Sequence, residues 1–364
     1  MRPAENEMRY LLLDVGAGTM DVLYYHSGSS LHYKAVVKSP VPLASEHAAG
    51  LPGNLLLTGC EMGGGALSSV LRDRAQSARV VMTASAAMTI SHNQARVREW
   101  GIQIVDDDAA KGFAHSGAYH SIHLTDLPIE RLERIVTGFG VPFDFDVAAI
   151  CAQDHGMPPE SMSHLDYRHS LYKQHLDRNP RPESVLYEAS EVPETLNRLR
   201  SIAQTASRLP AREVFVMDSG FAAILGASMD RKALERDRIL VLDIATSHTV
   251  GAALIGEELA GFFEYHTRDI TLEKLEELLR DLADGQLDHE RILAEGGHGA
   301  YLRKAVGFEN VQAIIATGPK RRLVESSQLP ITFGAPFGDN MMTGNVGMLE
   351  AIRRRKGLPP ITYL

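Results

Sequence analysis

Short apolar runs that end in an acidic residue recur in this chain. Tyr10–Leu13 is such a run and it ends at Asp14, after which a glycine turn leads to a second strand candidate over Met20–Tyr25. Short apolar runs bounded by turn residues are typical of buried strands. The pattern therefore predicts that the chain opens with a β-hairpin and that Leu31–Val37 adds a third meandering strand.

The same order of strands recurs in the second half of the chain. Arg238–Leu242 forms another largely apolar run that ends in an aspartate, Asp243, and a turn then leads to strand candidates over Val250–Ile255 and Glu258–Glu264. A repeat of this kind indicates an internal duplication. Between the two copies, strand and helix patterns alternate, which argues for an α/β layer.

Two stretches lack a clear pattern and are predicted to be irregular. Ser39–Gly53 is polar and is predicted to form a loop. Pro158–Pro182 is polar and rich in histidine, with little periodicity, and is predicted to form a lid or a loop-rich insertion.

Length, charge and terminal sequence set the class of protein. With 364 residues and 44% hydrophobic content, the chain is long enough for two domains rather than one. A net charge of -9 does not suit a nucleic-acid binder, which usually carries a basic face. The first residues have no apolar signal-peptide core, and no apolar stretch can cross a bilayer. We therefore expect a cytoplasmic protein with neither nucleic-acid nor membrane partners.

The first candidate site is the segment Asp-Val-Gly-Ala-Gly-Thr-Met-Asp, which supplies Asp14, Gly16, Gly18, Thr19 and Asp21. Glycines let a backbone approach a phosphate closely and permit turns with positive φ. A strand-end aspartate can hold Mg²⁺ or its water shell, and a threonine can add a hydroxyl donor. The spacing is neither that of a Walker loop nor that of a dinucleotide fingerprint. The alternative interpretation is an ordinary glycine hairpin with two surface acids.

This segment resembles the first phosphate motif of the superfamily that contains actin, sugar kinases and the heat-shock-chaperone ATPases. Four further segments follow in the order of that superfamily. Met217–Gly226 resembles its first connecting helix, and Leu242–Thr249 lies where its second phosphate motif is expected. Ile315–Arg321 resembles its adenosine motif, and Gly347–Ala351 resembles its second connecting helix. Together these segments span nearly the whole chain.

The resemblance implies a fold, a ligand and roles for individual residues. The implied fold is two actin-like, ribonuclease H-like α/β domains over residues 1–215 and 216–364, with an α/β insertion at about 40–210 and a ligand cleft between the domains. ATP and Mg²⁺ are the implied cofactors, and Asp14 and Asp243 are the implied magnesium ligands through water. The implied nucleotide contacts are Gly16, Gly18, Thr19, Asp21, Thr246 and Gly318.

The second phosphate motif departs from the superfamily pattern. Glycines normally follow its aspartate, whereas this chain has Ala245, Thr246 and Ser247. His248 stands where a threonine is common, and Thr317 replaces the first glycine of the adenosine motif. His248 is a candidate to face the γ-phosphate as a donor or phosphoryl acceptor. The alternative is a hydrogen-bonded turn residue.

The middle of the chain resembles a narrower family. Thr58–Gly65, followed by Ala84–Thr89 and Gly101–Ile104, is similar to the uncharacterised prokaryotic proteins called DUF1786, some of which are labelled pyruvate formate-lyase activating enzymes. An activating enzyme of that type needs a cluster site with three cysteines. The chain has only two, Cys60 and Cys151, which argues against a radical iron–sulfur activity.

Three further positions are candidates for binding or catalysis. Gly63–Gly65 opens a predicted helix, whose free N–H groups and dipole favour an anion; the alternative is that packing requires these glycines. Asp154 follows a buried strand and is a candidate general base for a hydroxyl acceptor; the alternative is a loop aspartate that caps the next turn. Asp218, just before the first connecting helix, is a second candidate to orient a water or an acceptor.

Histidines are frequent, with 15 in the chain. His155, His164, His169 and His175, together with Asp166, raise the question of a metal cluster. Their spacing matches no helix-based metal site such as His-Glu-x-x-His. Structural and solvent roles are therefore predicted for them.

Three functions fit these patterns. The first is a small-molecule kinase that uses the histidine-rich segment as its acceptor pocket and Asp154 as its base. The second is an ATPase that drives a partner protein. In both, positioning and charge neutralisation would supply most of the rate. The third is a nucleotide- or anion-binding sensor with little turnover, because the second phosphate motif is altered. The sequence identifies neither the acceptor nor the partner.

Overall fold

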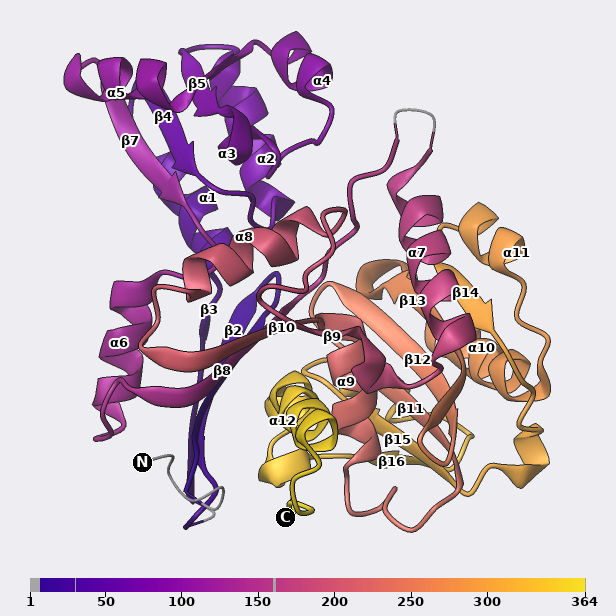
Figure 1. Cartoon of the computed structure of the whole chain (residues 1–364). Coiled ribbons are helices and arrows are strands. Elements are labelled where there is room, and N and C mark those ends of the chain that lie inside the picture. The colour runs from indigo at the N-terminus through magenta and orange to yellow at the C-terminus, as the bar shows by residue number, and fades with distance from the viewer. Residues whose placement is uncertain (1–6, 30, 160–161, 364) are drawn as a thin grey trace.

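The computed structural model describes residues 7–29, 31–159 and 162–363. Its three sheets have the strand orders β3-β2-β1-β8-β10-β9, β14-β13-β12-β11-β15-β16 and β6-β5-β4-β7 (Figure 1). The strands of the described residues are β1 Arg9–Val15, β2 Thr19–His26, β3 Leu31–Lys38, β4 Asn54–Gly59, β5 Val80–Thr83, β6 Ile102–Val105, β7 Tyr119–Leu124, β8 Phe145–Ala152, β9 Leu186–Glu188, β10 Ala211–Asp218, β11 Arg238–Ile244, β12 His248–Ile255, β13 Glu258–His266, β14 Gly299–Leu302, β15 Ala313–Thr317 and β16 Ile331–Phe333. The α-helices of the same residues are α1 Pro40–Gly50, α2 Gly65–Ala75, α3 Ala84–Ala87, α4 Gln94–Glu99, α5 Asp107–His115, α6 Ile129–Gly138, α7 His164–Arg178, α8 Asn197–Ala206, α9 Ser219–Ser228, α10 Leu272–Asp284, α11 His289–Ala294 and α12 Thr343–Lys356.

The two large sheets share one topology. In the first, β1 pairs antiparallel with β2 and parallel with β8, and β2 pairs antiparallel with β3. In the second, β11 takes the place of β1, because it pairs antiparallel with β12 and parallel with β15, and β12 pairs antiparallel with β13. A three-stranded meander followed by parallel strands is the topology of an actin-like domain. The prediction of two duplicated actin-like domains is confirmed by this repeat.

The central strands of each sheet are covered on both faces. All eight residues of β8 are buried, and the apolar run at the start of β1 is fully enclosed. Parallel strands with helices on both faces read as continuous apolar runs, which is why these strands are recognisable in the sequence. Within the described ranges, no helix is both long and apolar enough to span a membrane.

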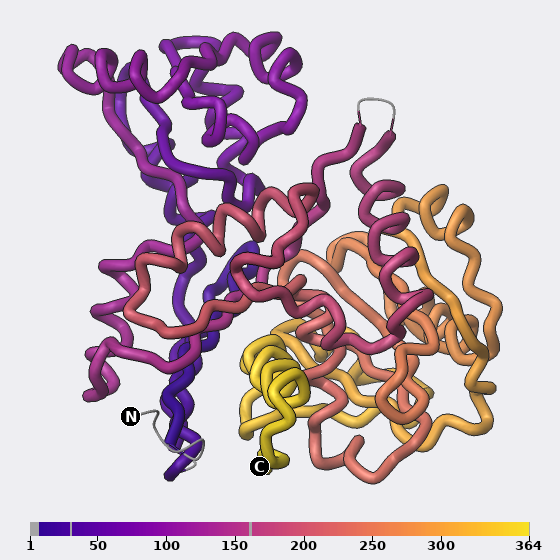
Figure 2. Tube along the Cα trace, viewed as in Figure 1, coloured from indigo at the N-terminus to yellow at the C-terminus, as the bar shows by residue number. Residues whose placement is uncertain are grey.

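A small α/β unit is inserted between β3 and β8. Its four strands are all parallel, and it lies above the first sheet in Figure 1, as the tube in Figure 2 also shows. The insertion expected at about 40–210 is too long, because β8 and β9 lie within that range and are strands of the first sheet. The domain boundary expected between 215 and 216 also falls inside β10, a strand of the first sheet. Strands and helices alternate both in the inserted unit and in the part of the first sheet that follows it. The sequence pattern therefore does not show where the inserted unit ends.

Two helices stand where loops were predicted. The side chain of Ser39 caps α1, and that of Ser163 caps α7. The buried positions of α7 are Arg168, Tyr172 and Leu176, spaced by four residues. This spacing is helical, but an arginine in the buried stripe interrupts the apolar period. A prediction based on hydrophobic periodicity therefore misses this helix.

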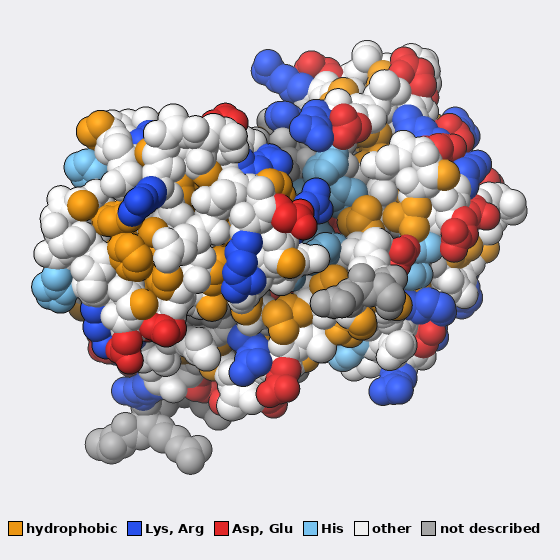
Figure 3. All heavy atoms as spheres, turned by 90° about the horizontal axis from the view of Figure 1, so that it is seen from above, with side chains coloured by type: hydrophobic (Ala, Val, Ile, Leu, Met, Phe, Trp, Pro, Cys, Tyr) orange, Lys and Arg blue, Asp and Glu red, His pale blue; other side chains and the backbone are white. Residues whose placement is uncertain are grey.

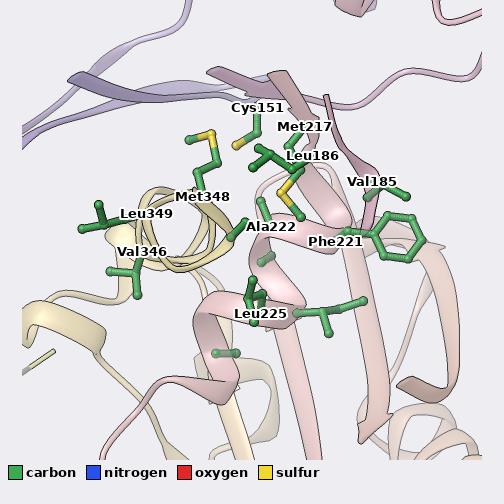
Figure 4. Close-up of a cluster of buried hydrophobic side chains, with 14 of the residues drawn as sticks. Cys151, Val185, Leu186, Met217, Phe221, Ala222, Leu225, Val346, Met348 and Leu349 are labelled. Atoms are coloured by element: carbon green, nitrogen blue, oxygen red, sulfur yellow. The ribbon is translucent and has the colours of Figure 1, made fainter. Parts of the chain in front are cut away.

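Helices α9 and α12 cross between the two large sheets. A Cβ atom on Gly226 would lie 1.8 Å from the carbonyl oxygen of Thr343, and one on Gly347 would lie 1.8 Å from that of Ala222. The two helix backbones are therefore in direct contact. Figure 4 shows the apolar side chains of both helices packed around this crossing. One hydrophobic cluster thus runs through the crossing from the first sheet into the second.

Candidate functional site

A cavity of about 820 Å³ is lined by both domains and by the inserted unit. Seen from above, histidine side chains gather along the hollow between the two lobes of the molecule (Figure 3). The cavity occupies the place where a ligand cleft was expected. The predicted site residues that line it are Asp14, Gly16, Gly18, Thr19, Asp21, Gly63, Gly64, Gly65, Asp154, Asp243, Thr246, His248 and Gly318.

Residues 16–18 join β1 to β2 and form the first candidate phosphate loop, called the first phosphate loop below. The Gly16 amide donates a hydrogen bond of 3.0 Å to the Thr19 carbonyl and closes the turn. Neither Gly16 nor Gly18 has a positive φ, so the expected conformational reason for these glycines is wrong. Gly18 provides space instead, because a Cβ atom there would lie 3.2 Å from the Thr246 methyl carbon of the second loop. The two phosphate loops therefore approach each other closely.

Residues 245–247 join β11 to β12 and form the second candidate phosphate loop, called the second phosphate loop below, which keeps the same turn without glycines. The Ala245 amide donates a hydrogen bond of 3.0 Å to the His248 carbonyl, just as Gly16 donates to Thr19. The Thr267 hydroxyl supports the loop by donating to the Ala245 carbonyl over 2.8 Å. Ala245 does not have a positive φ, so a small residue with a Cβ atom fits there. The altered sequence therefore keeps the same closing hydrogen bond as the first loop.

Three carboxylates gather at the loops. Loss of contact with water raises the pKa of Asp14 to about 7, that of Asp21 to about 8 and that of Asp243 to about 6. Repulsion from neighbouring carboxylates adds to the increase for Asp14 and Asp21. The Thr317 hydroxyl donates to Asp243 Oδ1 over 2.9 Å, whereas Asp21 Oδ1 is buried without a hydrogen-bond partner. Carboxylate oxygens are the ligands that Mg²⁺ prefers, so these residues fit the implied ion.

Two glycines bring backbone against these carboxylates. Gly318 has a φ of +87°, and a Cβ atom there would lie 2.9 Å from Asp243 Oδ1. A Cβ atom on Gly344, at the start of α12, would lie 2.1 Å from Asp14 Oδ2. Gly344 was not singled out in the sequence, because nothing there distinguishes it from other helix glycines. Gly344 therefore allows the start of α12 to lie directly against the Asp14 carboxylate.

Asp154 and Asp218 both have structural partners. Asp154 accepts hydrogen bonds from the amides of Gly156 and Leu199, at 2.7 and 2.9 Å, which is the capping role given as its alternative. It also lines the cavity, and burial raises its pKa to about 6. Asp218 accepts two hydrogen bonds from Arg168 and does not line the cavity. The hypothesis that Asp218 orients a water or an acceptor therefore lacks structural support.

Arg168 links the two domains beside the cavity. Its guanidinium lies 2.6 Å from an Asp218 oxygen and 3.4 Å from a Glu264 oxygen. Burial disfavours the charge, but the two carboxylates hold the pKa of Arg168 above its usual range. Burial likewise opposes ionisation of Glu264, and Arg168 holds the pKa of that carboxyl below its usual range. The sequence concealed this role because Arg168 stands in a segment predicted to be a loop.

His248 lies in a cluster with two histidines that the sequence analysis did not single out, His266 and His298. One ring nitrogen from each residue lies within 4.8 Å of the other two. Burial lowers the pKa of His248 to about 4, so its imidazole is neutral. A signal for part of this cluster exists in the sequence, because hairpin pairing places His248 opposite His266. His298 comes from a distant segment and had no such signal.

The histidines of the segment expected to be irregular lie apart from one another. His164 lines the cavity, His169 stacks on His289 with ring centroids 3.6 Å apart, and His175 contacts a serine. His155 lies nearer the cluster of three, with its ring centroid 6.5 Å from that of His248. In the part of the chain that the structure describes, these four histidines do not converge on a common point.

The inserted unit forms one wall of the cavity. The three glycines before and at the start of α2 line it, and a Cβ atom on Gly64 would lie 2.3 Å from the Thr89 carbonyl oxygen. Packing therefore requires that glycine, as the alternative interpretation held. Arg72 and Arg96 lie 5.0 and 5.4 Å from the ring centre of Trp100, and all three line the cavity. The wall thus presents two cationic groups as well as the helix start.

The sequence matches one family of proteins over most of its length. Residues 62–323 match the family described as "Putative pyruvate format-lyase activating enzyme (DUF1786)". No curated protein matches the sequence significantly.

Several solved structures are similar in fold. A protein of unknown function with an actin-like ATPase fold from Bacteroides thetaiotaomicron aligns with a TM-score of 0.36 at 8% identity, covering 97% of this chain and 98% of the other. MreB5 of Spiroplasma citri bound to ADP aligns with a TM-score of 0.34 at 11% identity, covering 96% and 98%. A ROK hexokinase from Thermus thermophilus aligns with a TM-score of 0.32 at 12% identity, covering 96% and 100%. These scores are low, so the fold assignment rests on the strand order of the two large sheets.

Proposed function

We propose that this chain, which belongs to the DUF1786 family, binds MgATP between its two phosphate loops and transfers the terminal phosphate to an acceptor or to water. The observation that carries the proposal is the close approach of the two loops, with Gly18 beside Thr246 and a strand-end aspartate in each half of the site, Asp14 and Asp243. Backbone N–H groups on two facing loops can surround a polyphosphate from both sides. Phosphoryl transfer depends chiefly on such positioning and charge neutralisation.

Magnesium fits the acidic side of this site. Asp14 and Asp243 would hold the ion through water, because Mg²⁺ dehydrates reluctantly and commonly binds through one or two carboxylates plus substrate phosphates. The bound ion would supply positive charge to the phosphates. It would also offset the repulsion between carboxylates that contributes to the raised pKa of Asp14.

The inserted unit supports an anionic acceptor. Arg72 and Arg96 line the cavity beside the start of α2, where a helix dipole also favours negative charge. A small molecule that carries both a hydroxyl and an acidic group would suit this wall. Asp154 is the candidate base on that side because it lines the cavity, although each of its oxygens already accepts a backbone amide.

Two other activities are less well supported. A sensor without turnover was suggested by the altered second motif, but the Ala245–His248 hydrogen bond preserves the turn of that loop. A radical activating enzyme, which the family description names, needs three clustered thiolates. The chain contains two cysteines, Cys60 and Cys151.

Calorimetric titration with MgATP, followed by a phosphate-release assay, tests the proposal. Asp14→Asn and Asp243→Asn should each weaken binding roughly tenfold, since a contact to a charged group is worth about 1.5–3 kcal/mol. Asp237→Asn is the matched control, because this exposed aspartate lies just before β11 and outside the cavity. Binding that survives both cavity substitutions, or no binding of any nucleoside triphosphate, would refute the proposal. Tight MgATP binding without phosphate release would contradict phosphoryl transfer and favour a nucleotide-binding sensor.

A further inference from the structure

We propose that the chain binds a divalent transition-metal ion through the imidazoles of His248, His266 and His298. One nitrogen from each ring lies within 4.8 Å of the other two. Zinc–nitrogen bonds are about 2.0–2.1 Å long, so small ring rotations would bring all three nitrogens to a common ion. Imidazole suits zinc, iron, nickel and copper, whereas magnesium prefers oxygen. This site is therefore chemically distinct from the carboxylates proposed to hold Mg²⁺.

The fold brings these histidines together by strand register and a loop contact. His248 begins β12 and His266 ends β13, and the two are paired across the antiparallel ladder. The His298 amide donates to the Glu264 carbonyl over 2.8 Å, which holds the third ring beside the same end of β13. The ring centroids are 4.7 Å apart for His248 and His266, and 4.3 Å apart for His266 and His298. All three side chains thus converge from ordered backbone.

An unsatisfied nitrogen points to a missing ligand. His248 Nε2 is buried without a hydrogen-bond partner. Buried polar atoms are nearly always paired, and an unpaired one carries an uncompensated desolvation cost. A metal ion coordinated by this cluster would relieve that cost. The ordinary alternative, a hydrogen-bonded structural histidine, does not account for the unpaired nitrogen of His248.

A carboxylate stands behind the cluster, as in many metal sites. Glu264 Oε1 lies 3.8 Å from His298 Nδ1, and the other oxygen of Glu264 accepts from Arg168 over 3.4 Å. A carboxylate that contacts a metal-binding imidazole fixes the orientation of the ring and strengthens the ligand. Arg168 holds this carboxylate in place from α7. The carboxylate of Glu264 and its partner Arg168 therefore add support for metal coordination to that of the three nitrogens.

The bound ion would face the cavity. His248, His266 and His298 all line it, together with both phosphate loops. Three protein ligands leave coordination positions open, as in catalytic rather than structural zinc sites. A ligand oxygen from a carboxylate or phosphate group could occupy these positions. The inference therefore adds an anion-binding metal to the site, and it does not rest on nucleotide binding.

Equilibrium dialysis against Zn²⁺ or Co²⁺, with the metal content measured by mass spectrometry, tests the proposal on the tag-free chain without nucleotide. We expect one ion per chain, not displaced by excess Mg²⁺. His248→Asn, His266→Asn and His298→Asn should each weaken binding by more than roughly tenfold, because even changes behind the ligands commonly cost 10–100-fold. His164→Asn is the control, since this histidine lines the same cavity outside the cluster.

A second measurement guards against variants that fail to fold. X-ray absorption of the Co²⁺-loaded unaltered chain should show three imidazole ligands, and circular dichroism should show that each variant retains its helices. Absence of stoichiometric binding, binding that survives the cluster substitutions, or equal loss in His164→Asn would overturn the proposal. Because no nucleotide is present, loss of metal binding is distinguishable from a failure of MgATP binding.

Discussion

The crossing of α9 and α12 makes a sharp prediction about stability. Gly347→Ala would place a Cβ atom 1.8 Å from the Ala222 carbonyl oxygen, far inside van der Waals contact. Alanine favours a helix over glycine by about 1 kcal/mol, whereas overpacking a core costs about 1–3 kcal/mol and occasionally more. The obstacle here is backbone of a second buried helix, which cannot rotate away. The upper end of that cost therefore applies, and we expect a net loss of about 2 kcal/mol.

Urea unfolding monitored by circular dichroism measures this change. The matched control is Gly112→Ala in α5, because a Cβ atom on Gly112 meets nothing within 4 Å. That substitution should stabilise the chain by about 0.5–1 kcal/mol. Gly347→Ala that is as stable as the parent chain would show that the helices separate freely, and the reasoning from the crossing would be wrong. A linked effect on the site is also expected, because the first turn of α12 presents Gly344 to Asp14.

Two further outcomes follow from the charges of the site. The raised pKa of Asp14, about 7, means that the folded chain retains a proton that the unfolded chain releases near pH 4. This contribution to stability is present below pH 4 and is lost as the pH rises through 7. Because Asp14 must be ionised to hold Mg²⁺, the ion should raise the melting temperature more at pH 8 than at pH 6. An equal rise at both pH values would contradict this reasoning. Arg168→Leu would leave Asp218 and Glu264 buried without their cation. Breaking a buried pair typically costs about 3–5 kcal/mol, so urea unfolding should show a loss of that size, and a change below about 1 kcal/mol would exclude the bridging role.

The phosphate loops show how far local patterns reach. The apolar runs before Asp14 and Asp243 predicted two equivalent strands, and the structure places them at the centres of two equivalent sheets. Sequence comparison also suggested that the second loop was degraded. The structure shows that Ala245 keeps the turn, because the position does not require a positive φ. The residue type changed while the backbone hydrogen bond was retained.

The catalytic candidates show where local patterns fail. Asp218 ends β10 and directly precedes α9, where the resemblance implied a functional aspartate, yet its carboxylate accepts two hydrogen bonds from Arg168 of α7. The sequence did not reveal this partner, because an arginine at a buried position of a helix makes the segment look like a polar loop. The cluster of His248, His266 and His298 was equally invisible as a group, since its third member lies 32 positions beyond the second in the printed sequence.

The sequence by itself determined the duplicated strand-turn-strand units and the positions of the two connecting helices. Those features depend on apolar periodicity and on turn residues, which act between near neighbours in the chain. Only the tertiary structure decided which charges are paired, which glycines are required for close approach, and which histidines meet. These outcomes depend on strand register and helix packing between segments far apart in the chain. Arg168, Gly344 and His298 carry no local signal for such contacts.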